Sequence, residues 1–241
     1  MSVCGNGWRR AHQVLRDPTV AGLLGQSLFS KAKVGAQIPL DLTACSTVQL
    51  EQMQSIFDKF GSDKGSFHGY QQVYAPIVQM LGPNINHLLE IGIGSNNPNL
   101  PSSMGSDGVP GASLRAWREI LPSAQIVGAD IDQNIMFREE RIETFPVDQR
   151  DRATLLGLLS QLRHSFGAFD VIIDDGLHEF RANLNSFEVL FELVRPGGFY
   201  VVEDVNPRLG QAWAHYLKKL DVPSSIVSFP KNSSAIVIMQ V

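Results

Sequence analysis

Two short apolar runs, about thirty residues apart, each end in a cluster of acids. The run FDVIIDDGLHEF carries Asp174, Asp175 and His178, and the run RPGGFYVVEDV carries Glu203 and Asp204. An apolar run that ends in charge is typical of a buried parallel strand with polar groups at its carboxyl end, which is the edge where open α/β sheets bind ligands. Clustered carboxylates repel each other unless a cation or a shared proton relieves them. The pattern therefore predicts a metal site with a base beside it.

Strand and helix patterns alternate from residue 86 onwards. The glycines of Pro196-Gly197-Gly198 are expected to end the helix before the FYVVEDV strand. The tail SSIVSFPKNSSAIVIMQV predicts a hairpin with a polar turn at Lys231-Asn232-Ser233. The whole predicts an α/β doubly wound sheet of about seven strands, mostly parallel with a C-terminal antiparallel hairpin, plus N-terminal helices. The parallel strands are expected in HLLEIGI, QIVGADI, IETFPVD, FDVIIDD and FYVVEDV, and the helices in ASLRAWREIL, near QNIMFRE, and in RATLLGLLSQLRHSF, FRANLNSFEVLFELV and QAWAHYLKKL.

The first sixty residues lack strand signals, so residues 1–60 are predicted to be a helical extension and residues 61–241 the main domain. LTACSTVQLEQMQSIFDKF has a helical apolar period, with Ser46 or Thr47 as its cap and Gly61 at its end. This helix is expected to pack on the domain. A lid or a contact between subunits of a homo-oligomer is the alternative.

Bulk composition excludes several classes of protein. The 241 residues carry a net charge of -4 with a pI near 5.8, which argues against a general nucleic-acid binder. Cys4 and Cys45 lack metal-ligand spacing. Neither a membrane-spanning run nor a signal peptide is recognisable. We therefore expect a soluble, cytoplasmic protein that contacts neither membrane nor nucleic acid.

The strand LLEIGI leads into a glycine turn with Gly92 and Gly94, which lets a ligand approach the backbone. The third glycine of the dinucleotide fingerprint GxGxxG is absent. Asp130 ends the next strand, where an acid accepts hydrogen bonds from ribose hydroxyls. Asp148 and Gln149 follow the third strand, where they can meet an adenine edge. These features predict a site for an adenosine-containing cofactor.

Two further segments flank this predicted site. SDKGSFHGYQQVY, residues 62–74, gathers polar and aromatic side chains, including Lys64 and His68, that can close over a cofactor. Residues 95–111 form a Gly-, Pro-, Ser- and Asn-rich loop that is long for its place between a strand and its helix. Such a loop is typically functional or disordered.

Seven segments, in order, resemble the class I S-adenosylmethionine-dependent methyltransferases, and more narrowly the metal-dependent sugar O-methyltransferases of the mycinamicin and macrocin pathways. The glycine turn is shared by a vast superfamily, whereas DDGxH with GGxYVxED at this spacing is more specific. The resemblance covers residues 62–205 and implies a Rossmann-like fold. Its marks are SDKGSFHGY, LLEIGIG, GASLRAW, IVGADI, VDQRD, IIDDGLHEF and RPGGFYVVEDV.

The resemblance implies a role for each matching residue. His178 would be the general base, with Asp175 as its catalytic partner. Asp175, Glu203 and Asp204 would bind a divalent metal, expected to be Mg²⁺. The S-adenosylmethionine-binding residues would be Lys64, His68, Glu90, Gly92, Gly94, Ser113, Asp130, Asp148, Gln149 and Asp174.

The expected activity is Mg²⁺-dependent methyl transfer to a hydroxyl of a small molecule, such as a sugar or other diol of a natural product. A metal-bound hydroxyl is more acidic and a neutral His178 can take its proton, so the residue chemistry agrees with this activity. Methyl transfer to nitrogen or a carboxylate, a nicotinamide-dependent oxidoreductase and a non-catalytic cofactor-binding protein remain alternatives. The larger relatives carry a big N-terminal domain, so the macrolide substrate does not transfer.

Overall fold

The computed structural model describes residues 38, 40–220, 222–229 and 233–241. The helices expected within residues 1–37, and the turn residues Lys231 and Asn232, lie outside the described residues. Within the described residues, an eight-stranded sheet has the order β3-β4-β2-β1-β5-β6-β8-β7. The strands are β1 (His87–Ile91), β2 (Gln125–Asp130), β3 (Arg138–Glu139), β4 (Ile142–Pro146), β5 (Phe169–Asp174), β6 (Val194–Val205), β7 (Ser224–Phe229) and β8 (Ser234–Gln240).

The central strands β4, β2, β1, β5 and β6 pair in parallel, while β8 pairs antiparallel with both β6 and β7. The predicted doubly wound, mostly parallel sheet with a C-terminal hairpin is confirmed. The expected number of about seven strands falls one short, because the two-residue β3, antiparallel to β4, is too short to leave a period in the sequence. It follows a 3₁₀ turn, Gln133–Ile135, where a short helix was expected.

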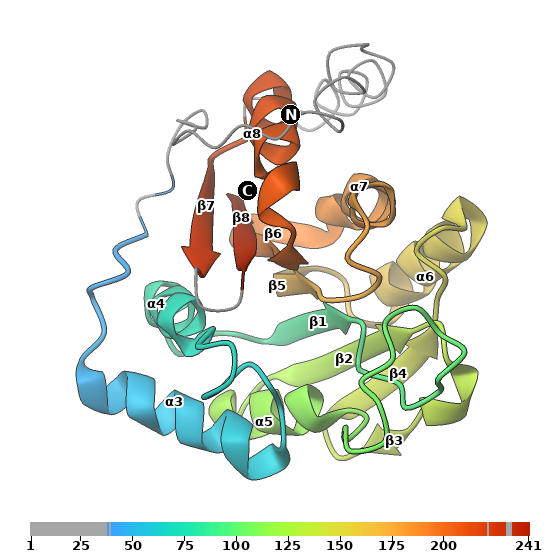
Figure 1. Ribbon diagram of the computed structural model, residues 1–241, viewed down its shortest axis with the longest axis horizontal. Helices are drawn as coiled ribbons and strands as arrows, with labels where there is room; N and C mark the ends of the chain where they lie inside the picture. The colour runs from blue at the N-terminus through green and yellow to red at the C-terminus, as the bar shows by residue number, and fades with distance from the viewer. Residues whose placement is uncertain (1–37, 39, 221, 230–232) are drawn as a thin grey trace.

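Helices cover both faces of the sheet (Figure 1). The first layer holds α3 (Thr47–Phe60), α4 (Gln71–Leu81) and α5 (Ala112–Ile120), and the second holds α6 (Arg152–Ser165), α7 (Phe180–Leu190) and α8 (Gly210–Leu220). Successive strand residues face opposite layers. Leu88 of β1 packs with the first layer and Leu89 with the second.

Helix α3 begins and ends where the sequence predicts. The Ser46 side chain accepts from the Gln49 backbone N–H in a capping box, and Gly61 ends the helix in the left-handed conformation. Met53 and Phe57 are buried in the core of the first layer. This helix packs on the sheet domain, as expected from its apolar face.

The prediction for Pro196-Gly197-Gly198 is wrong. Helix α7 already ends at Leu190, a 3₁₀ turn (Phe191–Leu193) follows, and β6 begins at Val194. Gly197 takes a positive φ of 77°, and Gly198 leaves no room for a Cβ against the Asp170 carbonyl oxygen. The glycines therefore serve an irregular strand entrance, and the same composition would also suit a helix end.

Candidate active site

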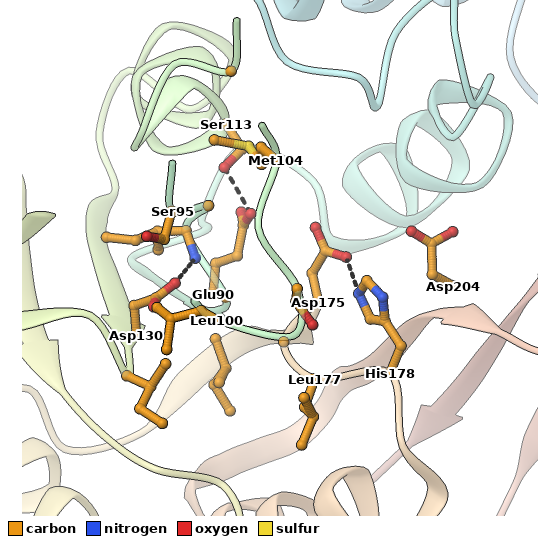
Figure 2. A pocket seen from close by; sticks show the side chains of 18 of the residues that line it. Glu90, Ser95, Leu100, Met104, Ser113, Asp130, Asp175, Leu177, His178 and Asp204 are labelled. Carbon is orange, nitrogen blue, oxygen red and sulfur yellow. Dashed lines mark hydrogen bonds and ion pairs between the residues drawn. The ribbon is translucent and has the colours of Figure 1, made fainter. Parts of the chain in front are cut away.

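A cavity of about 310 Å³ opens at the carboxyl edge of the parallel strands. Figure 2 shows Glu90, Ser113 and Asp130 on one side of it and Asp175, His178 and Asp204 on the other. Most of the predicted site residues line it, whereas His68, Asp174 and Glu203 lie outside its lining. Those that line it are Lys64, Glu90, Gly92, Gly94, Ser113, Asp130, Asp148, Gln149, Asp175, His178 and Asp204.

The glycine turn after β1 is bound to the tip of β2. Gly92 and Gly94 have positive φ values of 81° and 82°, which glycine adopts without strain. The Asp130 carboxylate accepts from the backbone N–H groups of Ile93, at 2.9 Å, and Asp132, at 3.0 Å. Burial raises the pKa of Asp130, partly offset by these backbone donors. The acid is thus fixed at the rim, and each carboxylate oxygen retains a second lone pair for a ligand.

Glu90, near the end of β1, is held by two side chains of α5. Ser113 Oγ donates to Oε1 at 2.6 Å and Trp117 Nε1 donates to Oε2 at 2.8 Å. Ser113 and Trp117 are four residues apart, so both project from one face of the helix. Burial raises the pKa of Glu90, and the nearby Lys64 ammonium partly offsets this. This arrangement gives the cavity a rigid, polar floor.

At the opposite end, Asp175, His178 and Asp204 place one ligand atom each within 4.8 Å of the others. His178 Nε2 lies 3.2 Å from Asp175 Oδ1. His178 and Asp204 have positive φ values of 58° and 47°, which are uncommon for residues with a side chain and recur at active sites. Carboxylate and imidazole donors at this spacing fit a divalent cation.

The charges of this cluster shift its pKa values. Burial alone would lower the pKa of His178, but the hydrogen bond and the charge of Asp175, helped by Asp204, raise it to about 9. Burial would raise the pKa of Asp175, but Lys64 and His178 hold it well below its usual range. The pair is therefore an imidazolium and a carboxylate when nothing else neutralises the acids.

Glu203 and Asp204 both face the side of α4, although neighbouring strand residues normally alternate. A β-bulge explains this, because β6 advances from Val202 to Val205 while β8 advances only two residues. Tyr74 donates to Glu203, and Tyr70, one helical turn earlier, donates to Asp204. Glu203 is 1% exposed and is not one of the three residues, Asp175, His178 and Asp204, that form the metal-ligand cluster. Its expected role as a metal ligand stays a prediction.

Lys64 lines the cavity but is only 1% exposed. Its Nζ is 2.6 Å from Asp175 Oδ2, 2.6 Å from Glu203 Oε2 and 3.5 Å from Glu90 Oε1. Burial would lower the pKa of Lys64, but these carboxylates raise it well above its ordinary value. Burial and repulsion from Asp175 raise the pKa of Glu203. Lys64 contacts the predicted metal end and the predicted cofactor end alike.

Gln149 braces the site from inside. Its Nε2 donates to Asp174 Oδ1 and Ser186 Oγ, at 2.7 and 2.8 Å, and its Oε1 accepts from the Leu177 backbone N–H at 2.8 Å. Asp174 is fully buried, and burial raises its pKa to about 6 despite the Gln149 hydrogen bond. These contacts fix the chain that carries Asp175 and His178. The predicted contact of Gln149 and Asp174 with a cofactor remains a prediction.

Asp148 and His68 also have protein partners. The Asp148 carboxylate accepts from the Arg150 side chain at 3.0 Å, which lowers its pKa. The His68 ring stacks on Tyr70 and lies 3.8 Å from Asp204. His68 is therefore placed beside the predicted metal end, whereas the sequence analysis assigned it to the cofactor.

The loop 95–111 forms one wall of the cavity. Met104 N donates to Ser95 O at 2.8 Å, and Asn96 Nδ2 donates to Gly108 O at 3.0 Å. The Met104 side chain lies on Gly94, where a Cβ would come within 2.3 Å of its sulfur. The position of the loop in the cavity wall favours the expected functional role.

Sequence reasoning assigned no role to Trp117, and it placed Tyr70 and Tyr74 only in a segment that can close over a cofactor. The four-residue spacings Tyr70–Tyr74 and Ser113–Trp117 were visible signals, because each places two polar groups on one helical face. Their partners are acids more than twenty residues away in the chain. That pairing required the fold.

No protein-family model matches the chain. Demethylmacrocin O-methyltransferase of Streptomyces fradiae is 31% identical over 198 residues, covering 77% of this chain and 47% of that protein. A rhamnosyl-tetracenomycin-C 2'-O-methyltransferase of Streptomyces olivaceus is 32% identical over 148 residues, covering 61% of this chain and 36% of that protein. Mycinamicin VI 2''-O-methyltransferase of Micromonospora griseorubida is 42% identical over 95 residues, covering 39% of this chain and 23% of that protein. The chain thus spans less than half the length of these relatives.

A solved structure of the MycE methyltransferase from the mycinamycin biosynthetic pathway, in complex with Mg and SAH, superposes with a TM-score of 0.59. It is 25% identical and covers 80% of this chain and 54% of that chain. Among the described residues, no helix is long and apolar enough to cross a membrane. By its sheet order, its strand-end motifs and these similarities, the chain is similar to the class I S-adenosylmethionine-dependent methyltransferases and, among them, to sugar O-methyltransferases.

Proposed function

We propose that this chain catalyses Mg²⁺-dependent methyl transfer from S-adenosylmethionine to a hydroxyl of a small molecule, a sugar or other diol group of a natural product. One observation carries the proposal. A single cavity runs from the glycine turn and Asp130 to the Asp175–His178–Asp204 cluster. A cofactor in the first part would point its reactive group towards an acceptor held at the second.

The proposed roles follow from the contacts. Asp130 would accept hydrogen bonds from the ribose hydroxyls at the rim, and the glycine turn with Glu90 would accommodate the methionine part. Asp175 and Asp204 would hold the cation, with Glu203 as the further predicted ligand. The bound cofactor would supply the methyl group, and a bound cation would make the acceptor hydroxyl more acidic.

His178 takes the proton of the acceptor hydroxyl at the ring nitrogen that Asp175 does not engage. Its pKa of about 9 is set by the negative charge of Asp175 and Asp204. Once those charges are neutralised, the ring loses the interactions that keep it protonated and can act as a base near neutral pH. In this proposal, binding of the cation to the acids lowers the pKa of His178 and so makes the ring available as a base.

The curated relatives are named for methyl transfer to oxygen, including the 2' position of a rhamnosyl tetracenomycin and the 2'' position of mycinamicin VI. These names support a hydroxyl acceptor on a glycosylated small molecule over nitrogen or a carboxylate. The cytoplasm is the proposed location, and a small-molecule acceptor is the proposed partner.

Calorimetric titration with S-adenosylhomocysteine, first in Mg²⁺ and then in excess chelator, tests the cofactor. We expect binding in both conditions, because the metal lies on the acceptor side. A screen of glycosides with neighbouring hydroxyls, read by mass spectrometry for one added methyl group, tests the reaction. Binding of NAD but not of S-adenosylhomocysteine would favour an oxidoreductase. Tight cofactor binding without turnover on any diol would favour a non-catalytic protein, and undiminished turnover in chelator would remove the metal role.

A further inference from the structure

Lys64 bridges the ends of three neighbouring strands. Its partners are Glu90 of β1, Asp175 directly after β5 and Glu203 of β6, and these strands are adjacent in the order β1-β5-β6. An ammonium group has three donors, so its hydrogens can each face one of these carboxylates. The lysine comes from the loop between α3 and α4, far from all three strands in sequence. One buried cation thus ties the floor of the cavity to the metal-ligand cluster.

The surroundings make this cation necessary. Glu90 and Glu203 are each 1% exposed, and buried carboxylates are costly unless they are paired and hydrogen-bonded. Neutral donors also bind these carboxylates: Ser113 and Trp117 donate to Glu90, and Tyr74 donates to Glu203. Lys64 is the fixed positive charge that contacts all three acids.

The two carboxylate oxygens of Asp175 face different partners. Its Oδ2 faces Lys64 and its Oδ1 faces His178, which also belongs to the metal-ligand cluster. A divalent cation held by Asp175 would share this carboxylate with the lysine ammonium. Two positive charges on one carboxylate repel each other, and solvent screens the charge of Lys64 weakly because its side chain is 1% exposed.

We propose that Lys64 is an internal counter-ion that takes the place of a divalent cation and competes with it for Asp175 and Glu203. This inference rests on the proposed function. Lys64 keeps the acids assembled when the metal is absent, and it holds metal affinity down when the metal is present. When the cation binds Asp175, the ammonium group keeps Glu90 as its partner. Binding of the metal therefore changes the contacts of Glu90, at the floor of the cavity, through Lys64. Lys64 is a positioning residue in this scheme and has no part in the chemical step.

The test compares Lys64→Met, which retains length and removes the charge, with the wild type. The matched control is Lys59→Met, because the Lys59 side chain is 59% exposed and pairs with Glu119 at the surface, away from the cavity. Thermal unfolding in chelator and in Mg²⁺, with calorimetric Mg²⁺ titration, gives readouts that are independent of activity. We expect Lys64→Met to unfold at a lower temperature in chelator, to regain more stability from Mg²⁺ than the wild type, and to bind Mg²⁺ about ten-fold tighter or more. Lys59→Met should match the wild type in all three.

A second comparison covers the case in which Lys64→Met does not fold. The single variant Glu203→Gln and the double variant Lys64→Met/Glu203→Gln differ only at residue 64. The double variant buries one carboxylate fewer than Lys64→Met, so it has one fewer unpaired charge that could prevent folding. The double variant should bind Mg²⁺ several-fold tighter than Glu203→Gln alone. Equal or weaker Mg²⁺ binding in both lysine comparisons overturns the inference.

Titration of the same samples with S-adenosylhomocysteine separates the two proposals. Cofactor and metal binding by the wild type, without tighter metal binding in the lysine variants, overturns only the role of Lys64. Cofactor binding without metal binding in any variant overturns the metal role and this inference together. Absence of cofactor binding in the wild type overturns the proposed function, while the metal titrations still decide the role of Lys64.

Discussion

The backbones of Gly92 and Asp175 lie against each other, and a Cβ atom on Gly92 would come within 2.1 Å of the Asp175 carbonyl oxygen. The Asp175 N–H also donates to Ile91 O at 2.8 Å, so the two strand ends are joined at this point. Gly92 begins the turn at the predicted cofactor end, and Asp175 begins the predicted metal end. The two parts of the site are therefore built on one backbone contact.

Replacing Gly92 with alanine should disrupt both parts of the site. The φ of 81° already costs an alanine about 1–2 kcal/mol, and the contact with Asp175 forces the strand ends apart in addition. We expect a larger loss of unfolding free energy than strain alone gives, together with weaker binding of S-adenosylhomocysteine and Mg²⁺. Urea unfolding and calorimetry measure these effects.

Gly167→Ala is the matched control for that variant. Gly167 has a φ of 78°, but nothing lies within 4 Å of its would-be Cβ. It should show the strain cost of about 1–2 kcal/mol and unchanged ligand binding. Equal effects of the two variants on stability and binding would contradict the importance of the Gly92–Asp175 contact.

Asp204→Asn should separate metal binding from cofactor binding. Asp204 belongs to the metal-ligand cluster, and Tyr70 donates to it, so the amide loses the charge while keeping an oxygen acceptor. We expect Mg²⁺ affinity to fall at least about ten-fold and methyl transfer to be lost, since a lost charge interaction of about 1.4 kcal/mol is already a factor of ten. S-adenosylhomocysteine affinity should stay within about two-fold of wild type, a change of less than about 0.5 kcal/mol. Glu51→Gln, at an exposed position of α3, is the control, and normal turnover by Asp204→Asn would rule out the assigned role.

In chelator, the contribution of His178 to stability should decrease as pH rises. The folded-state pKa of about 9 lies above the ordinary value of 6.5, because the interactions with Asp175 and Asp204 outweigh burial. A raised histidine pKa stabilises the folded state fully below pH 6.5, and this gain is lost between about pH 6.5 and 9. The melting-temperature difference between wild type and His178→Gln should therefore be largest near pH 6.5 and shrink as the pH approaches 9. A difference that grows between pH 6.5 and 9 would contradict the raised pKa of His178. In Mg²⁺ the difference should depend less on pH.

The strand ends were predictable because apolar runs and terminal acids are local signals. The positions of β1, β2, β4, β5 and β6 and the hairpin followed from them. The two-residue β3 was missed, because so short a strand carries no period. The strand entrance at Pro196–Gly198 was misassigned, because proline and glycine suit several kinds of chain break equally.

The site was predictable as a set of residues but not as a set of contacts. The bulge that turns Glu203 and Asp204 to one side depends on pairing with β8, which no local pattern reveals. Lys64 and Glu203 lie 139 residues apart, and only the fold places the ammonium 2.6 Å from the carboxylate. Gln149 was predicted to meet the cofactor from its position after β4, and only the fold shows that its amide also contacts Asp174 and the Leu177 backbone.

Phe57→Ala tests whether α3 belongs to the folded domain or acts as a separate extension, as the predicted boundary at residue 60 implies. Phe57 is fully buried and packs edge-on against Trp117, with ring centroids 5.0 Å apart, and Trp117 in turn donates to Glu90. Truncating a buried phenylalanine to alanine costs about 3–5 kcal/mol. We expect one cooperative urea transition with that loss, and weaker S-adenosylhomocysteine binding because Trp117 loses its support. Val48→Ala on the same helix, where Val48 is 60% exposed, should change the unfolding free energy by about 0.5 kcal/mol or less. If Phe57→Ala leaves the main transition unchanged, α3 is an extension that unfolds independently.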